Sequence, residues 1–121
     1  MAEAIGISLR EARHDERPVR VGGIGSVKTH PAARRRGLAG RGVNRAIEFF
    51  RDQPGVEFAV LVCGPHLLAY YGHLGWREFG GRLTVQQRGA TVEFTFNRVM
   101  TCGIQAPPPQ AGTIDLLGPP W

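Results

Sequence analysis

The segment VEFAVLVC, residues 56–63, most strongly limits what this chain can fold into. It is a nearly continuous apolar run of strand-forming residues between the turn sequence DQPG and the pair Gly64-Pro65. A run of this length and composition predicts a strand that is buried on both faces of a sheet. The other elements of the chain therefore have to be arranged around this strand.

A hairpin is predicted before this strand. Residues 4–12 alternate apolar and polar side chains, which indicates a half-buried strand, and the polar residues RHDERP then form a turn. Residues 19–29 return as a second strand, and their glycines predict a bulge or a close backbone neighbour. Two more strands, residues 81–87 and 90–100, alternate around Arg88-Gly89 and predict a second hairpin.

Helical periodicity is found in two segments. Residues 36–51 carry one apolar stripe and stop before Pro54, and residues 66–74 predict a short helix that Gly75 closes. The stripe consists of Ala39, Val43, Ala46, Ile47 and Phe50. We therefore expect one domain over residues 1–121, a mixed α/β sheet with two helices, followed by an extended proline-rich bridge at residues 105–112.

The charge of the chain is positive and is carried mainly by arginine. Lys and Arg total 15 against 10 Asp and Glu, and Lys28 is the only lysine. This bias favours planar, bidentate recognition of phosphate or carboxylate. Cys63 and Cys102 form no C-x-x-C pair, and the chain shows neither a signal peptide nor an apolar run of roughly 18 residues, so we expect a reduced, cytoplasmic protein.

Arginine and glycine are concentrated in HPAARRRGLAGRG, residues 30–42, between a predicted strand and a predicted helix. At a helix N-terminus the first N–H groups have no intrahelical partner, and Gly37 and Gly40 would let a phosphate approach them. A solvated basic helix start is the alternative. The glycines are not followed by the Lys-Ser or Lys-Thr pair of a P-loop, and no G-x-G-x-x-G of a dinucleotide fold leads the helix.

These motifs resemble the GNAT (Gcn5-related) N-acetyltransferases. Arg34-x-x-Gly37-x-Ala39 matches the family's R/Q-x-x-G-x-G/A element, and Tyr71 to Trp76 is similar to its Tyr-x-x-x-Gly-Phe/Trp segment. The ending IDLLGPPW is similar to that of the aminoglycoside 2'-N-acetyltransferase branch, whose members also finish on tryptophan. The resemblance covers residue 5 to the end and implies a mostly antiparallel GNAT-type sheet.

The resemblance implies acetyl-CoA as the acetyl donor, no metal, and a primary amine of a small molecule as the acceptor. The donor's pyrophosphate would bind amides from Arg35 to Gly40, and the pantetheine arm would pair with the main chain of Val27 and Thr29, from which the strand at residues 56–63 must splay. Arginines would assist at the 3'-phosphate, with Arg45 as an addition. The complete expected donor site is Val27, Thr29, Arg34, Arg35, Arg36, Gly37, Leu38, Ala39 and Gly40.

Tyr71 matches the position of the family's general acid. A phenol with a pKa near ~10 is protonated at neutral pH and can protonate the departing thiolate. A core aromatic is the alternative for Tyr71 and for its neighbour Tyr70. The general base is open, because Gly25 or Ser26 stands where related enzymes carry a glutamate. His30, His66, His73 and ordered water remain as candidates.

The resemblance implies that the terminal carboxylate of Trp121 binds the acceptor amine, with Asp115 as an addition. The acidic residue expected just before the last tryptophan is replaced by Pro119 or Pro120, which weakens an aminoglycoside as the acceptor. Packing of the terminal aromatic on the sheet is the alternative.

The resemblance also implies that the family's first strand and two helices are absent from this chain, so we expect exposed apolar surface along residues 4–12. A GNAT remnant that binds CoA without efficient catalysis is therefore the alternative function. A nucleic-acid module is disfavoured, because no exposed aromatic residues are interleaved with the arginines, and no membrane partner is expected. A homodimer is compatible with the resemblance, since many relatives pair through their C-terminal strands.

Overall fold

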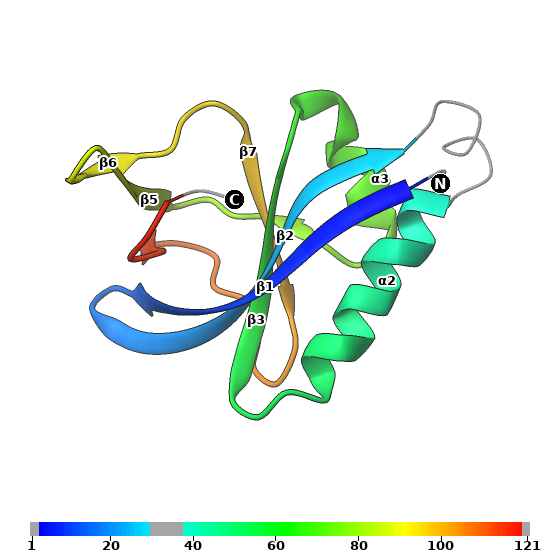
Figure 1. Ribbon diagram of the computed structural model, residues 1–121, viewed down its shortest axis with the longest axis horizontal. Coiled ribbons are helices and arrows are strands. Elements are labelled where there is room, and N and C mark those ends of the chain that lie inside the picture. Colours follow the sequence, from blue (N-terminus) through cyan, green and yellow to red (C-terminus); the bar gives the residue numbers. More distant parts are fainter. Residues whose placement is uncertain (1–2, 30–37, 120–121) are drawn as a thin grey trace.

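The computed structural model describes residues 3–29 and 38–119, with side chains except at residues 3–5, 26–29 and 38–41. Its strands belong to one curled eight-stranded sheet in the order β4-β7-β3-β2-β1-β8-β5-β6 (Figure 1). The strands are β1 (Glu3–His14), β2 (Arg17–Thr29), β3 (Val56–Cys63), β4 (Arg77–Glu78), β5 (Arg82–Gln87), β6 (Ala90–Glu93), β7 (Arg98–Gly103) and β8 (Thr113–Asp115). The helices are α2 (Leu38–Arg51) and α3 (Leu68–His73), the latter preceded by a 3-10 turn, η1 (Pro65–Leu67).

The first predicted hairpin is confirmed. Strands β1 and β2 pair antiparallel from Glu3↔Thr29 to His14↔Arg17, around a turn in which Asp15 and Glu16 have positive φ angles of 49° and 71°. The predicted bulge is also present. From Gly6 to Ala4, β1 advances two residues, while the partner positions on β2 advance three, from Gly25 to Lys28. The extra residue of β2 lies in this interval.

Strand β3 has the central position that its composition predicts. It pairs parallel with β2 on one edge and antiparallel with β7 on the other, and six of its eight residues are buried. Both helices pack on one face of the sheet, where they share a core cluster with Ile24, Leu61 and Met100. The stripe of α2 is confirmed for Val43, Ala46, Ile47 and Phe50, all of which are buried.

The second face of the sheet is covered by strands instead of helices. A separate core cluster joins residues of β2 and β3 to Leu83 and Val85 of β5 and to Ile114 of β8. Strand β8, which the sequence did not predict, pairs parallel with β5 and antiparallel with the tip of β1. This curl explains how a strand as apolar as β3 is buried on both faces with helices on only one.

The second hairpin is confirmed, but its second strand is shorter than predicted. Strands β5 and β6 pair around Arg88 and Gly89, whose φ angles are 53° and 79°. The prediction of one strand over residues 90–100 is wrong, because β6 ends at Glu93 and β7 begins at Arg98. The first part pairs with β5, whereas the second part pairs with β3, and the chain must bend to reach both partners.

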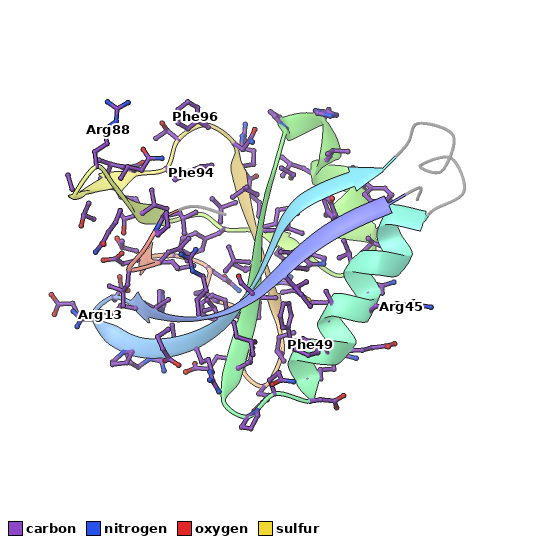
Figure 2. The ribbon with its side chains drawn as sticks, in the orientation of Figure 1. Arg13, Arg45, Phe49, Arg88, Phe94 and Phe96 are labelled. Carbon is purple, nitrogen blue, oxygen red and sulfur yellow. The ribbon has the colours of Figure 1, made fainter. Side chains whose placement is uncertain are left out.

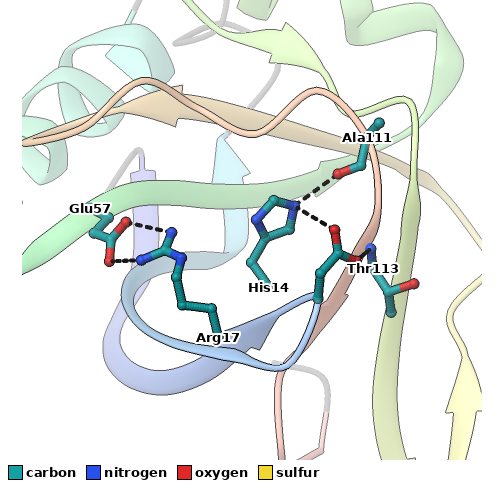
Figure 3. Close-up of polar contacts among 6 residues, drawn as sticks. His14, Arg17, Glu57, Ala111 and Thr113 are labelled. Atoms are coloured by element: carbon teal, nitrogen blue, oxygen red, sulfur yellow. Dashed lines mark hydrogen bonds and ion pairs between the residues drawn. The ribbon is translucent and has the colours of Figure 1, made fainter.

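The segment before β8 is attached to the tip of the first hairpin. At the tip, His14 Nε2 donates to the carbonyl of Ala111 at 2.8 Å, and Asp15 Oδ1 accepts from the amide of Thr113 at 2.8 Å (Figure 3). Nearby, Arg17 donates two hydrogen bonds of 3.0 Å to the carboxylate of Glu57. The contacts of His14 and Asp15 fix the end of the proline-rich segment to the sheet, and none of that segment forms a strand before Thr113.

The contact of α2 with the sheet depends on a glycine. A Cβ added at Gly22 of β2 would lie 2.6 Å from ring atoms of Phe50, so only a residue without a side chain lets this helix pack so closely. A Cβ added at Gly72 of α3 would meet no atom within 4 Å. No helix among the described residues is long and apolar enough to cross a bilayer.

We expect Gly22→Ala to lower the free energy of unfolding by about 1–3 kcal/mol, because α2 must move away from β2 or Phe50 must leave its rotamer. The same substitution at Gly72 should be neutral or stabilising by roughly 0.5–1 kcal/mol, since alanine restricts the unfolded chain and favours a helix. Urea unfolding followed by circular dichroism measures both. Equal stabilities of the two variants would contradict the close contact.

Candidate active site

Strands β2 and β3 stop pairing before either of them ends. Their parallel register runs from Arg20↔Val56 to Ile24↔Leu61, while β2 continues to Thr29. In Figure 1 the carboxyl ends of the two strands diverge. Within the described pairings, none of the last five residues of β2 is paired with β3, and Gly25, Lys28 and Thr29 are paired with β1. Val27 and Thr29, predicted from resemblance to bind the donor through their main chain, lie in this part of β2.

The bulge in β2 gives a physical cause for this divergence. It lies between Gly25 and Lys28, directly after Ile24, the last residue of β2 that pairs with β3. A bulge bends its strand and increases the local twist. One strand can then stay in register with β1 on one side and leave β3 on the other. The predicted splaying of β3 from β2 thus has a local sequence origin in the segment GIGSVKT.

Helix α2 begins on the chain segment that follows the open end of β2. Leu38, Ala39 and Gly40 form its first described turn, and this turn carries no acidic residue. The N–H groups of a first helical turn lack intrahelical partners and attract anions. Arg34, Arg35, Arg36 and Gly37, the rest of the predicted phosphate loop, lie outside the described residues, as does His30. Arg45, one turn further along α2, is exposed (Figure 2).

Tyr71 is buried on the face of the sheet that the helices cover. Its side chain is 4% exposed and belongs to the same core cluster as Ile24 and Leu61, the last pair of the parallel register. The ring of the half-buried Tyr70 stands nearly perpendicular to it, with 5.2 Å between the ring centroids. The two tyrosines therefore differ in burial, as expected for neighbours on a short helix.

The position of Tyr71 is fixed by the end of α3. Its carbonyl accepts hydrogen bonds from the amides of Leu74 at 3.0 Å and Trp76 at 3.1 Å. Gly75 lies between them with a φ of 97°, which confirms the predicted glycine C-cap. The indole of Trp76 is buried in the same cluster. The Tyr-x-x-x-Gly-Trp pattern is thus a structural unit that closes α3 and buries the first and last residues of the pattern.

Cys63 was not assigned a role from the sequence, whereas His66 and His73 were candidates for the general base. Cys63 ends β3 and is buried in the same cluster, and burial raises the pKa of its thiol, with a smaller contribution from Glu78. The thiol is therefore neutral at pH 7. His66 follows β3 in η1 and is exposed, and a Cβ added at Gly64 would lie 2.7 Å from its ring. His73, at the end of α3, is also exposed.

The structure does not bring Asp115 to Tyr71. Asp115 of β8 lies beside Arg13, which faces Pro18 at the start of β2, and its Oδ1 accepts from the amide of Leu117 at 2.9 Å. Seven residues of extended chain, about 23 Å, separate Pro18 from Gly25, where β2 leaves β3. Trp121 and Pro120 lie outside the described residues.

The described residues contain no group of three His, Cys, Asp or Glu side chains arranged to hold a metal ion.

A profile described as the Acetyltransferase (GNAT) domain matches residues 6–79, which include the hairpin, α2, β3 and α3. A search of curated proteins finds no significant match.

Solved structures share this fold. A GCN5-related N-acetyltransferase from Kribbella flavida is 28% identical with a TM-score of 0.57, and the match covers 67% of this chain and 20% of that protein. Arabidopsis thaliana NAA60 in complex with a bisubstrate analogue is 14% identical with a TM-score of 0.64, over 87% of this chain and 66% of that one. Escherichia coli YhbS in complex with CoA is 15% identical with a TM-score of 0.57, over 97% and 61%.

This chain thus spans a fifth to two thirds of the length of these solved proteins. The profile match covers more than half of the chain and includes the bulged strand, the arginine-rich loop and the Tyr-x-x-x-Gly-Trp unit. The chain belongs to the GNAT acetyltransferase family.

Proposed function

We propose that this protein is an acetyl-CoA-dependent N-acetyltransferase that acetylates a primary amine of a small molecule. The observation that carries the proposal is the divergence of β2 from β3 after Ile24 and Leu61, with Tyr71 buried in the same core cluster as these two residues. Family membership supports the reaction class. The complexes of NAA60 with a bisubstrate analogue and of YhbS with CoA support the donor.

The donor is proposed to bind along the open edge of β2 and at the start of α2. Main-chain groups of Val27 and Thr29 would form hydrogen bonds with the pantetheine arm, in place of the bonds that β3 does not make there. The pyrophosphate would accept hydrogen bonds from amides between Arg35 and Gly40, where the helix dipole favours an anion. The guanidinium groups of Arg34, Arg35 and Arg36 would add charge-assisted contacts.

The proposed reaction is a direct acetyl transfer. The neutral amine attacks the thioester carbonyl carbon, the C–N bond forms, and the C–S bond then breaks. The departing CoA thiolate receives a proton from the Tyr71 hydroxyl, the amine loses its proton to solvent, and solvent returns a proton to the Tyr71 phenolate before the next turnover. Two observations support this role for Tyr71: its side chain is 4% exposed, and it shares a core cluster with Ile24 and Leu61, the last pair of the parallel register.

The acceptor is proposed to approach at the carboxyl ends of β2 and β3. An aminoglycoside-like acceptor is the narrower form of this proposal and rests on the resemblance of the C-terminal residues IDLLGPPW, with the carboxylate of Trp121 attracting the amine. We do not include Asp115 in this site, because it lies at the far end of β2 and its carboxylate caps the turn at Leu117.

The alternative is a remnant that binds CoA with little turnover. One observation favours it: Gly25 or Ser26 of β2 stands where related enzymes carry a glutamate, and neither residue is a base. Titration calorimetry with acetyl-CoA and a free-thiol release assay across primary amines distinguish the two functions. An enzyme binds acetyl-CoA and releases the free thiol of CoA when an amine is present, whereas a remnant binds acetyl-CoA without releasing thiol.

Replacing Tyr71 with phenylalanine should lower kcat by roughly 10²–10⁴-fold and leave the affinity for acetyl-CoA nearly unchanged, because only the proton donor is lost. Tyr70→Phe is the matched control, since it removes the same hydroxyl from the adjacent, half-buried ring. Steady-state thiol release and calorimetry measure the two quantities. Equal loss of turnover and affinity in the Tyr71 variant would mean that this tyrosine is structural.

Replacing Arg34 with glutamine should weaken acetyl-CoA binding by roughly 10- to 100-fold, the range for one lost charge-assisted hydrogen bond to phosphate. The affinity of the parent chain should fall as salt is added, and that of the variant should fall less steeply. Arg88→Gln, on the exposed turn of the second hairpin, is the control (Figure 2). If both substitutions change the affinity equally, the arginines act only through net charge.

A further inference from the structure

The edge of β1 that faces away from β2 has no strand partner among the described residues over most of its length. Strand β8 pairs with β1 only at Arg13 and His14, and no other described strand pairs with this edge. Toward the N-terminal end, Ile7 and Leu9 are 45% and 36% exposed, although both stand opposite residues of β2 on the face that α2 covers. The expectation of exposed apolar surface along this strand is therefore confirmed at these two positions. An apolar edge of this kind is a template for another strand.

The edge is suited to pair with its own copy. Two identical strands related by a two-fold axis run antiparallel, so each supplies the hydrogen-bonding groups that the other lacks. The position of the axis decides which side chains face one another. With the axis at Ser8, Ile7 of each copy faces Leu9 of the other, and Gly6 faces Arg10.

Neighbouring registers are less favourable. An axis at Leu9 places Ile7 opposite Glu11, and an axis at Arg10 places two arginines opposite each other. An axis at Ile7 places Glu3 of one copy opposite Glu11 of the other. Like charges directly opposite one another destabilise a strand pair, whereas facing apolar side chains stabilise it. An axis at Leu9 still joins the two Leu9 side chains, but only the axis at Ser8 gives both Ile7 and Leu9 an apolar partner without opposing like charges.

We propose that two copies of this chain associate through antiparallel pairing of their β1 strands around a two-fold axis at Ser8. This surface differs from the C-terminal strands that many family members use. A second copy is favoured over an unrelated peptide, because the same short segment provides both the apolar pair and a charge arrangement compatible with itself. The paired segment is short compared with a standard interface of about 1,600 Å², so the association is reversible and concentration-dependent.

Disulfide trapping tests the register. In a Ser8→Cys variant the two new cysteines face each other across the axis, and Cα atoms of facing residues lie about 4.5–5.5 Å apart, within the range of a disulfide. We expect a covalent dimer on a non-reducing gel after mild oxidation. Thr91→Cys, exposed on the edge strand β6, is the control for random collision. The parent chain should not cross-link at this rate, because Cys63 is buried and burial raises the pKa of both native thiols.

Sedimentation velocity over a range of concentrations tests the surface without a new thiol. The parent chain should show concentration-dependent dimerisation, and Leu9→Lys should abolish it while the thermal unfolding curve is retained. Val92→Lys is the matched control, because Val92 is 37% exposed and lies on the edge strand β6. The proposal is overturned by a parent chain that is monomeric at every concentration, by equal cross-linking of the two cysteine variants, or by a dimer that Leu9→Lys leaves intact.

Discussion

The separation of two parallel strands within a continuous sheet is the feature on which the rest of this structure depends. Parallel strands in the centre of a sheet normally exchange hydrogen bonds along their whole overlap, because an unpaired buried amide costs free energy. Here β2 leaves β3 after Ile24, at the same place where it gains an extra residue against β1. The groups of β2 that face away from β1 after this point are therefore open to another hydrogen-bonding partner, which in the proposed function is the donor.

The surrounding core holds the diverging strands in place. Close packing of Phe50 on Gly22 fixes α2 against β2 just before the bulge, and Tyr71 and Cys63 fill the space at the end of β3. The opposite face is closed by β5 and β8, which the contacts at the tip of the first hairpin attach to β1. Strands on one face and helices on the other thus leave β3 buried on both faces.

Several parts of this fold could be predicted from the sequence because they depend on local patterns. Alternation of apolar and polar side chains predicted the two hairpins, and a 3.6-residue apolar period predicted α2. The apolar run 56–63 predicted the central strand. The boundary at residues 94–97 and strand β8 could not be predicted in this way. Strand β8 has three residues and exists because β1 and β5 both offer an edge to it, which is a property of the assembled sheet.

The residues of the candidate site likewise fall into those that local motifs predict and those that only the assembled fold positions. Tyr71 and the open end of β2 could be located from motifs, since each depends on short-range chemistry: a glycine cap for α3 and a bulge in a glycine-rich strand. The acceptor side of the site could not be located from motifs, because the position of Asp115 depends on strand pairing between segments about a hundred residues apart. Cys63 and the burial difference between Tyr70 and Tyr71 likewise follow from tertiary packing alone.

Hydrogen exchange with and without saturating acetyl-CoA tests the central claim most directly. If the donor replaces β3 as the partner of β2, amides of residues 25–29 and of the following loop through residue 41 exchange more slowly in its presence, while the hairpin β5–β6 is unchanged. Unaltered exchange over residues 25–41 at saturation, or protection confined to β5–β6, would contradict the account.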